Sequence, residues 1–464
     1  MIHLFDDTIA APATIPGTGA VTLIRVSGPE AFRVVDEVVS LSDGTVSESA
    51  GYSLHFGSIS GLDDVLVSVF RAPRSYTGED AVEISCHASE YIAREILSRL
   101  IAAGARMAEP GEFTRRAFMN GKMDLSQAEA VADVIASNTS ASHRVAYHQL
   151  KGGFSAELND LREQLLEMAS LLELELDFSE EDVEFADRSR LLLLLDSTID
   201  HVRRLTDSFR LGNVIKKGIP VAIAGAANSG KSTLLNTLLG EERAIVSDVA
   251  GTTRDTIEEC VNIDGILFRF VDTAGIRETS ETVEKMGIDR TFSAISHAQI
   301  VLGVLDGTLE ESVLWNNARQ IYEAAQKGEN HLVLLLNKAD LSINKNVINT
   351  NKFVSLVDNK DDVILISAKT GLGIDLLRRR LFDLEKGLVS NQNSTFVTNV
   401  RHYDALVEAS DYLQKSRSAL AASLPGDLIS EDLRLALRAL GSITGAVTDS
   451  EILGRIFSTF CIGK

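Results

Sequence analysis

The segment Gly225–Ser232, GAANSGKS, has the residue types and spacing of a phosphate-binding loop. Its glycines allow backbone N–H groups to turn towards phosphate oxygens, and its final lysine and serine suit the β/γ-phosphates and Mg²⁺. An apolar run, Ile219–Ala224, precedes the loop, and Thr233–Leu239, with helical spacing of leucines, follows it. This strand–loop–helix order predicts a nucleotide site, because the helix N-terminus adds positive potential near the phosphates.

Three further motifs, in the order expected of a G domain, narrow the nucleotide to GTP. The DTAG motif at Asp272–Gly275 ends a strand, where a carboxylate near Mg²⁺ and a glycine near the γ-phosphate are required. The NKAD motif at Asn337–Asp340 offers an aspartate that can accept from guanine N1–H and the 2-amino group, whereas adenine would leave its charge unpaired. The SAK motif at Ser367–Lys369 supplies a backbone N–H for the guanine carbonyl. One such motif could be an ordinary strand end, but the ordered set predicts a GTP-binding domain.

The residue after the DTAG motif is Ile276, where Ras-like enzymes place a glutamine that orients the attacking water. Isoleucine cannot orient water, so another residue must. The acidic segment 277–284 offers candidates, although a solvated switch loop accounts for most of its charges.

Asn228 in the phosphate-binding loop is followed by GTTRD at Gly251–Asp255, in the expected first switch. A side-chain carbonyl beside the phosphates could help ligate a monovalent cation, which would supply the charge that an arginine finger provides elsewhere. A loop-capping role is equally consistent with this asparagine.

The hydrophobic pattern predicts an α/β and α architecture. Short alternating runs and one helical run, Glu90–Ala103, indicate an N-terminal α+β domain at 1–120, and leucine-rich periodicity indicates a helical domain whose first part is 121–215. Gly212 and Lys216–Gly218 are interpreted as a linker. Alternating strands and helices then predict an inserted Ras-like P-loop G domain with a mostly parallel sheet at 216–383, and the second part of the helical domain at 384–464.

Composition places limits on location and partners. Three cysteines without paired spacing, no apolar segment long enough to span a membrane and no secretory signal predict a cytoplasmic protein without a membrane partner. The formal net charge of −21 repels nucleic acid in bulk, so action on RNA requires local basic patches, a partner or both.

Taken together, the G-domain motifs resemble the potassium-dependent bacterial GTPases of the Era/Der/MnmE group, and both ends of the chain narrow the resemblance to the MnmE (TrmE) family. The segments that carry it outside the G domain are Asp7–Ala10, Gly17–Ala20, Ile24–Gly28, Tyr76–Asp80, Glu83–Ile84, Pro110–Phe118, Asp124–Ala130 and Leu453–Lys464, which ends in FCIGK. The resemblance covers the whole chain.

The resemblance implies a GTPase that acts with the FAD-dependent partner MnmG. Together they add an aminomethyl or carboxymethylaminomethyl group to C5 of the wobble uridine of certain tRNAs. It implies that the N-terminal domain binds 5-formyl- or 5,10-methylene-tetrahydrofolate and forms a homodimer, and that K⁺-dependent pairing of G domains accompanies GTP hydrolysis. It further implies that FAD is bound by the partner and not by this chain, and that the two proteins form a heterotetramer or larger complex.

The resemblance also assigns residues. It makes Glu284 the catalytic acid residue, which would orient water through a bridging water in place of the missing glutamine. Mg²⁺ would be held by Ser232 and Thr253, and K⁺ by Asn228, Ser247, Val249 and Thr252. The folate contacts would be Arg25, Glu83, Lys122 and Lys464. The full set predicted for GTP is Asn228, Ser229, Gly230, Lys231, Ser232, Thr233, Ser247, Thr252, Thr253, Asp272, Gly275, Asn337, Lys338, Asp340, Ser367, Ala368 and Lys369.

Some alternatives stay open at this point. Cys461, beside Lys464, could be a low-pKa nucleophile in the modification chemistry or a small buried residue that packs the terminus. A ribosome-assembly or RNA-surveillance GTPase would share the G motifs but would normally carry a basic RNA-binding module. A folate-sensing interaction protein with purely regulatory hydrolysis is a third possibility.

Overall fold

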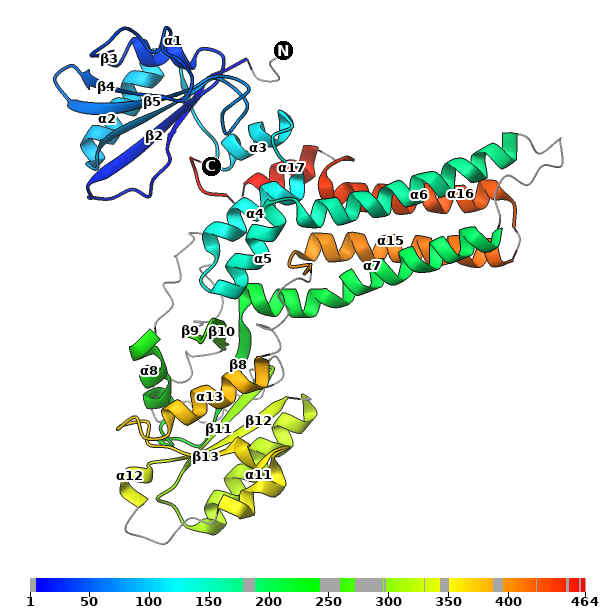
Figure 1. The fold of residues 1–464 in the computed structure, drawn as a ribbon. Helices are drawn as coiled ribbons and strands as arrows, with labels where there is room; N and C mark the ends of the chain where they lie inside the picture. Colours follow the sequence, from blue (N-terminus) through cyan, green and yellow to red (C-terminus); the bar gives the residue numbers. More distant parts are fainter. Residues whose placement is uncertain are drawn as a thin grey trace. The chain divides into compact units, whose positions relative to one another are not determined.

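The computed structural model describes residues 6–177, 188–242, 259–271, 295, 298–328, 330–342, 350–386, 395–422, 424–447, 450–458 and 460–463. Figure 1 shows the fold coloured along the sequence, and the contacts within the chain divide it into two compact units. Unit 1 comprises Met1–Ala132, Gln149–Leu195 and Asp411–Lys464, and unit 2 comprises Asp133–His148 and Asp196–Ser410. The four domain ranges expected from the sequence stay a prediction, because this division groups residues by their contacts and does not test those ranges.

Unit 1 begins with a sheet of order β3-β4-β5-β6-β2-β1-β7, in which β1 and β7 are parallel and the other described pairs antiparallel. Two helices, α1 (Ala31–Asp36) and α2 (Glu90–Ala102), bury their apolar sides against alternate residues of the strands. The strands are β1 (Ile9–Pro12), β2 (Val21–Ser27), β3 (Ser40–Leu41), β4 (Ser53–Ile59), β5 (Asp63–Phe70), β6 (Ala81–His87) and β7 (Arg106–Met107). The period-2 burial along β5 and β6 accounts for the short alternating runs that the sequence shows in this domain.

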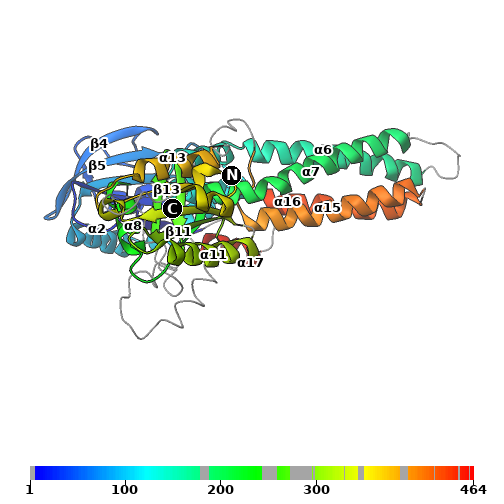
Figure 2. The same cartoon turned by 90° about the horizontal axis from the view of Figure 1, so that it is seen from below.

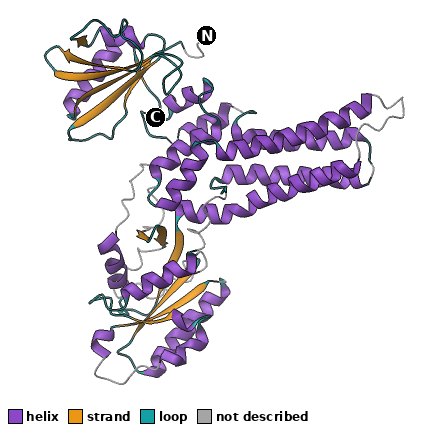
Figure 3. Ribbon diagram, viewed as in Figure 1, coloured by secondary structure: helices purple, strands orange, loops and turns teal. Residues whose placement is uncertain are grey.

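The remainder of unit 1 is helical (Figure 3). Its helices include α3 (Glu112–Met119), α4 (Leu125–Ala136), α6 (Gly153–Asp177), α16 (Gly426–Thr444) and α17 (Ser450–Phe457). Helices α6 and α16 pack along each other (Figure 2), and both bury leucine stripes. Phe457 and Phe460 near the end of the chain pack with Leu125 and Ala128 of α4, which fixes the C-terminal segment in this unit.

Unit 2 contains a six-stranded sheet of order β13-β12-β11-β8-β10-β9, parallel except for the edge strand β9. The strands are β8 (Ile219–Ala224), β9 (Glu259–Ile263), β10 (Ile266–Phe270), β11 (Ile300–Asp306), β12 (His331–Asn337) and β13 (Val363–Leu365). The helices joined to it are α8 (Lys231–Glu242), α11 (Glu311–Lys327), α12 (Ala339–Ser342) and α13 (Ile374–Glu385), with 3₁₀ turns η2 (Thr350–Leu356) and η3 (Lys360–Asp362). The predicted mostly parallel sheet is confirmed.

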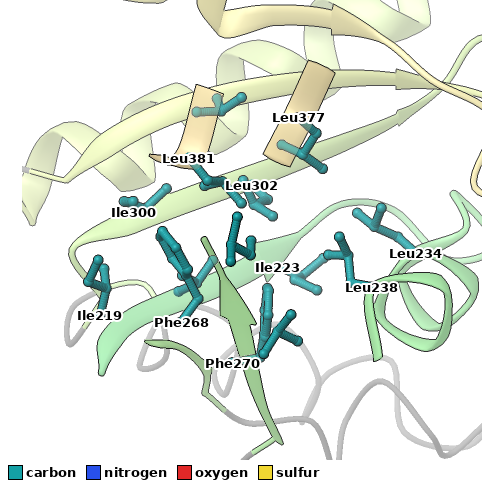
Figure 4. Close-up of a cluster of buried hydrophobic side chains, with 14 of the residues drawn as sticks. Ile219, Ile223, Leu234, Leu238, Phe268, Phe270, Ile300, Leu302, Leu377 and Leu381 are labelled. Carbon is teal, nitrogen blue, oxygen red and sulfur yellow. The ribbon is translucent and has the colours of Figure 1, made fainter. Parts of the chain in front are cut away.

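Two apolar clusters cover the two faces of this sheet, which is why its strands are almost continuously hydrophobic. On one face, Phe268 and Phe270 of β10 and Leu302 of β11 meet Leu234 and Leu238 of α8, together with α13 (Figure 4). This packing holds α8, and with it the preceding phosphate-binding loop, against the centre of the sheet.

The linker expected around Gly212 is wrong. Helix α7 (Arg188–Lys217) runs through Gly212, and the chain turns into β8 only at Gly218, whose φ is +86°. Gly212 lies against the Val397 carbonyl, just before α15 (Val400–Ala421), so closely that a Cβ would overlap its oxygen. The Val397 amide donates to Ser208 Oγ at 3.1 Å. Close packing, not flexibility, therefore accounts for this glycine.

Helix α5 (Ser140–Leu150) also contributes to unit 2, since Ala141 belongs to the core beneath β9 and β10. Lys216 near the end of α7 pairs with Asp133 at 2.7 Å. Within the part of the chain that the structure describes, no helix combines the length and apolar composition needed to cross a bilayer.

Candidate functional site

The loop after β8 can be formed only with glycine at two of its positions. A Cβ on Gly225 would lie 2.8 Å from Ser229 Oγ and would overlap the Val304 carbonyl oxygen. Gly230 has a φ of +102°, and a Cβ there would overlap the side-chain amide of Asn337. Asn228 has a φ of 58°, in the left-handed region that asparagine tolerates better than most residues. The spacing of these residues is thus fixed by backbone geometry.

The interior of this loop suits an anion. Lys231 donates from Nζ to the carbonyl oxygens of Gly225 and Ala226, both at 2.9 Å, and burial lowers the pKa of this lysine. Ser229 Oγ is buried without a hydrogen-bond partner among the described residues. The first turn of α8 follows at once, with Ser232 and Thr233 beside the lysine. A phosphate would supply a negative charge for Lys231 and a hydrogen-bond partner for Ser229 Oγ, so the loop fits a nucleotide.

One side chain joins this loop to the two predicted guanine-recognition motifs. Asn337, buried at the end of β12, donates from Nδ2 to the Ser229 carbonyl at 2.7 Å. Its Oδ1 accepts from the Ala368 amide at 2.9 Å. Because β8, β12 and β13 are parallel, their carboxyl ends meet at one edge of the sheet, and Asn337 lies between the loops that follow them.

The acidic residue of the NKAD motif is fixed by the SAK motif. Ser367 donates from Oγ to Asp340 Oδ1 at 2.7 Å. This hydrogen bond holds one of the two carboxylate oxygens of Asp340. The structure therefore joins the NKAD and SAK motifs through Asp340 and Ser367, and their role in base recognition stays a prediction.

Two residues at this edge, Asp306 and Thr237, were missed by the sequence analysis. Lys338, with a φ of 64°, extends its ammonium to Asp306 Oδ2 at 2.6 Å, at the end of β11. Burial works to raise the pKa of Asp306, but hydrogen bonds from Lys338 and Thr308 outweigh it, so the pKa lies below its usual value. Asp306 could have been found as a strand-end carboxylate beside the NKAD strand. Thr237 of α8, which donates to the Ala368 carbonyl at 2.7 Å, has no sequence signature.

Several predicted residues lie outside the described part of the chain, and the structure does not place them. These are Ser247, Val249, Thr252, Thr253, Asp272, Gly275, Glu284 and Lys464. Of the predicted metal ligands, the structure therefore describes Ser232 and Asn228, both at the phosphate-binding loop.

The candidate folate residues of unit 1 gather around the loop that follows β5. Arg25 of β2 is the cross-strand neighbour of Glu83 of β6, and its guanidinium contacts Glu83 Oε1 at 2.8 Å. The same guanidinium lies over the rings of Tyr76 and Phe113, at 5.1 and 5.6 Å from the centroids. Its Nη1 also donates to the Gly463 carbonyl at 3.5 Å, so the C-terminal motif and this pair share one site.

Lys122, in the turn that follows α3, approaches the same loop, since its Nζ donates to the Pro73 carbonyl at 2.8 Å and its aliphatic stem lies against Gly78. Cys461 is exposed, which does not agree with the packing alternative, and its carbonyl accepts from the Gly111 amide at 3.4 Å. The fourth predicted contact, Lys464, follows Gly463 directly in the sequence.

A buried ionic network holds this loop in place. Arg116 of α3 is fully buried and contacts Glu112 at 3.1 Å, Glu79 at 3.2 Å and Asp7 at 2.8 Å. Burial works to raise the pKa of Glu112, but hydrogen bonds from Arg106, the Glu109 amide and Arg116 keep it below its usual value. The charge on Glu112 is thus compensated at neutral pH, and the loop that carries Tyr76 is tied to α3.

A phosphate-binding loop whose neighbouring strand ends carry NKAD and SAK motifs, joined through one asparagine, defines a P-loop protein that binds guanine nucleotides. Comparison with known proteins narrows this class. The family model described as MnmE helical domain matches residues 125–461, and the model described as GTP-binding protein TrmE N-terminus matches residues 8–122. The chain belongs to the MnmE (TrmE) family of tRNA modification GTPases, which confirms the resemblance found in the sequence.

Individual relatives are similar to this chain over almost the whole length of both proteins. The tRNA modification GTPase MnmE of Bacteroides fragilis is 51% identical over 467 residues, which covers 99% of this chain and 100% of that protein. The protein of the same name from Flavobacterium johnsoniae is 50% identical and covers 99% of each chain. Among solved structures, a GTP-binding protein from Sulfolobus solfataricus in complex with GDP covers 49% of this chain and 67% of its own, at 21% identity and a TM-score of 0.28, too low to support an argument.

Proposed function

We propose that this chain binds and hydrolyses GTP in order to modify tRNA. With an FAD-dependent partner, MnmG, it adds an aminomethyl or carboxymethylaminomethyl group to C5 of the wobble uridine, and a 5-formyl- or 5,10-methylene-tetrahydrofolate supplies the carbon. The observation that carries the GTP assignment is the Asn337 side chain, which holds the phosphate-binding loop and the guanine-recognition loop together. Family membership over the full length supports the tRNA substrate.

The proposal gives the described groups the following roles. Lys231 exchanges its two carbonyl partners for β/γ-phosphate oxygens, and Asp340 accepts from the guanine ring. Ser232, with Thr253, holds Mg²⁺, which would neutralise charge on the phosphates when bound. Asn228, with Ser247, Val249 and Thr252, holds K⁺, and Glu284 orients the attacking water.

In unit 1 the proposal makes Arg25, Glu83, Lys122 and Lys464 the folate contacts. The support is chemical: a guanidinium between a carboxylate and two aromatic rings can bind a flat heterocycle or a ligand carboxylate. The protein acts in the cytoplasm as a homodimer, in a larger complex with its partner.

The potassium-dependent mechanism is tested by GTP turnover in matched K⁺ and Na⁺ buffers. Turnover is expected to be much faster in K⁺, and Glu284→Ala is expected to abolish turnover while fluorescent GDP still binds with wild-type affinity. Equal rates in the two salts would contradict the K⁺ site. Loss of GDP binding in the variant would contradict the catalytic role of Glu284.

The tRNA assignment is tested by mass spectrometry of tRNA nucleosides from cells that lack the gene. The C5-modified wobble uridines are expected to disappear and to return when the wild-type gene is restored, but not when Glu284→Ala is supplied instead. Unchanged wobble uridines in the deletion strain would refute the proposed reaction, whatever the GTPase activity of the purified protein.

A further inference from the structure

Thr237 links the helix that follows the phosphate-binding loop to the SAK loop. Its Oγ1 lies 2.7 Å from the Ala368 carbonyl oxygen and 2.9 Å from the Thr233 carbonyl oxygen in its own helix. A threonine hydroxyl has one proton, so these two acceptors share it, and the shorter contact is the one outside the helix. The buried leucines Leu234 and Leu238 hold helix α8 against the sheet, and they therefore fix the position of Thr237 between them.

The carbonyl that Thr237 contacts belongs to the peptide between Ala368 and Lys369. The Ala368 amide is already used within the protein, because it donates to Asn337 Oδ1 at 2.9 Å. The next backbone donor in this loop is the Lys369 N–H, which shares a peptide plane with the Ala368 carbonyl. This peptide is trans, so its C=O and N–H point in opposite directions. A hydroxyl that fixes the carbonyl towards α8 therefore directs the Lys369 N–H away from α8.

We propose that Thr237 is a positioning residue for guanine recognition: its hydroxyl orients the Ala368–Lys369 peptide so that the Lys369 N–H donates to the 6-oxo group of the base. The inference rests on the proposed GTP site and adds a residue to it. Donation to the carbonyl also polarises the peptide, which strengthens the N–H as a donor. The loop is thereby held in its binding conformation before the nucleotide arrives, which reduces the ordering cost of binding.

The competing explanation is local. Threonine in a helix commonly donates to the carbonyl one turn earlier, here Thr233, and such a bond has no consequence for a ligand. The two explanations differ in what removal of the hydroxyl does to nucleotides that carry or lack the 6-oxo group.

The test uses Thr237→Val, which removes the hydroxyl and keeps the branched shape, and Thr237→Ser, which restores the hydroxyl. Asn236→Ala, at an exposed position of the same helix, is the matched control. Dissociation rates of ribose-labelled GDP and IDP are measured by stopped flow on the full chain, and 2-aminopurine riboside diphosphate, which lacks the 6-oxo group, is measured by competition.

Thr237→Val is expected to release GDP and IDP about fivefold faster, the effect of one neutral hydrogen bond, with most of the change in the dissociation rate. Thr237→Ser and Asn236→Ala are expected to stay close to the wild-type rate. The affinity for the 2-aminopurine nucleotide is expected to be the same in Thr237→Val and wild type.

Equal rates of GDP release by Thr237→Val and wild type would overturn the inference. So would a loss of affinity for the 2-aminopurine nucleotide as large as the loss for GDP, because it would indicate a general loosening of the site. If Thr237→Val lowers the melting temperature of the nucleotide-free protein, Thr237→Ala is used in its place. The loss of GDP binding is then again compared with the loss of binding of the 2-aminopurine nucleotide, and only a larger loss for GDP supports the inference. Failure of the wild-type protein to bind GDP would instead refute the proposed function.

Discussion

At the scale of single residues, the nucleotide site depends on side chains that fix backbone groups as much as on those that would touch the ligand. Asn337 uses its amide to join two loops, and Ser367 uses its hydroxyl to hold one oxygen of Asp340. Both arrangements leave the ligand-facing groups preorganised. A substitution at Asp340 should therefore change which base is bound more than it changes the fold.

Asp340→Asn is expected to lower the affinity for GDP about 100-fold or more and to make XDP the preferred ligand. The asparagine Oδ1 can still accept from N1–H, but its amide would face the 2-amino group of guanine as a donor, whereas it can donate to the 2-oxo group of xanthine. Competition titrations with both diphosphates measure the ratio. Asp375→Asn, an exposed carboxylate of α13, should leave the ratio unchanged. An unaltered preference for GDP in Asp340→Asn would remove Asp340 from base recognition.

The residue scale also shows what the sequence could and could not predict. Gly225, Lys231, Asn337 and Asp340 were found because a local motif with strand–loop–helix context restricts each of them. Thr237 could not be found, because its contact with Ala368 depends on how α8 lies against the sheet and no local pattern encodes that. The predicted residues of the two switch segments lie outside the described chain, so their roles stay predictions.

At the scale of elements, the helices and strands were predicted where hydrophobic periodicity is strong, and the prediction failed where tertiary packing overrides local preference. Glycine inside a helix is unfavourable relative to alanine, which is why Gly212 suggested a linker. In the structure α7 continues through it, because the chain before α15 approaches so closely that only glycine fits. Phe209 of α7 stacks on Tyr403 of α15 at 4.5 Å beside this contact.

Gly212→Ala is expected to lower the melting temperature even though alanine favours a helix by about 1 kcal/mol. The added Cβ would overlap the Val397 carbonyl oxygen, and overpacking costs about 1–3 kcal/mol, which exceeds the gain. Gly240→Ala in α8 is the matched control, since a Cβ there meets open space among the described residues and should stabilise the protein. Differential scanning calorimetry compares the two variants. A Gly212→Ala protein as stable as Gly240→Ala would show that α7 and Val397 do not pack as described.

At the scale of the whole molecule, the two candidate sites fall in different compact units. Every described GTP residue belongs to unit 2, whereas Arg25, Glu83, Lys122 and Cys461 belong to unit 1. Helices α7 and α15 each contribute residues to both units, so each unit contains part of the same two helices. A ligand that stabilises either unit therefore acts on part of α7 and part of α15.

Hydrogen exchange with each ligand separately should show which unit each ligand stabilises. A ligand at 100 times its dissociation constant stabilises its folded site by about 2.7 kcal/mol, which slows exchange through unfolding about 100-fold. GDP is expected to protect β8, β12 and α8, and 5-formyltetrahydrofolate is expected to protect β2 and β6. Asp340→Asn should lose the protection by GDP and keep that by the folate. Protection of β2 and β6 by GDP as strong as that of β8 would mean that the two units unfold as one.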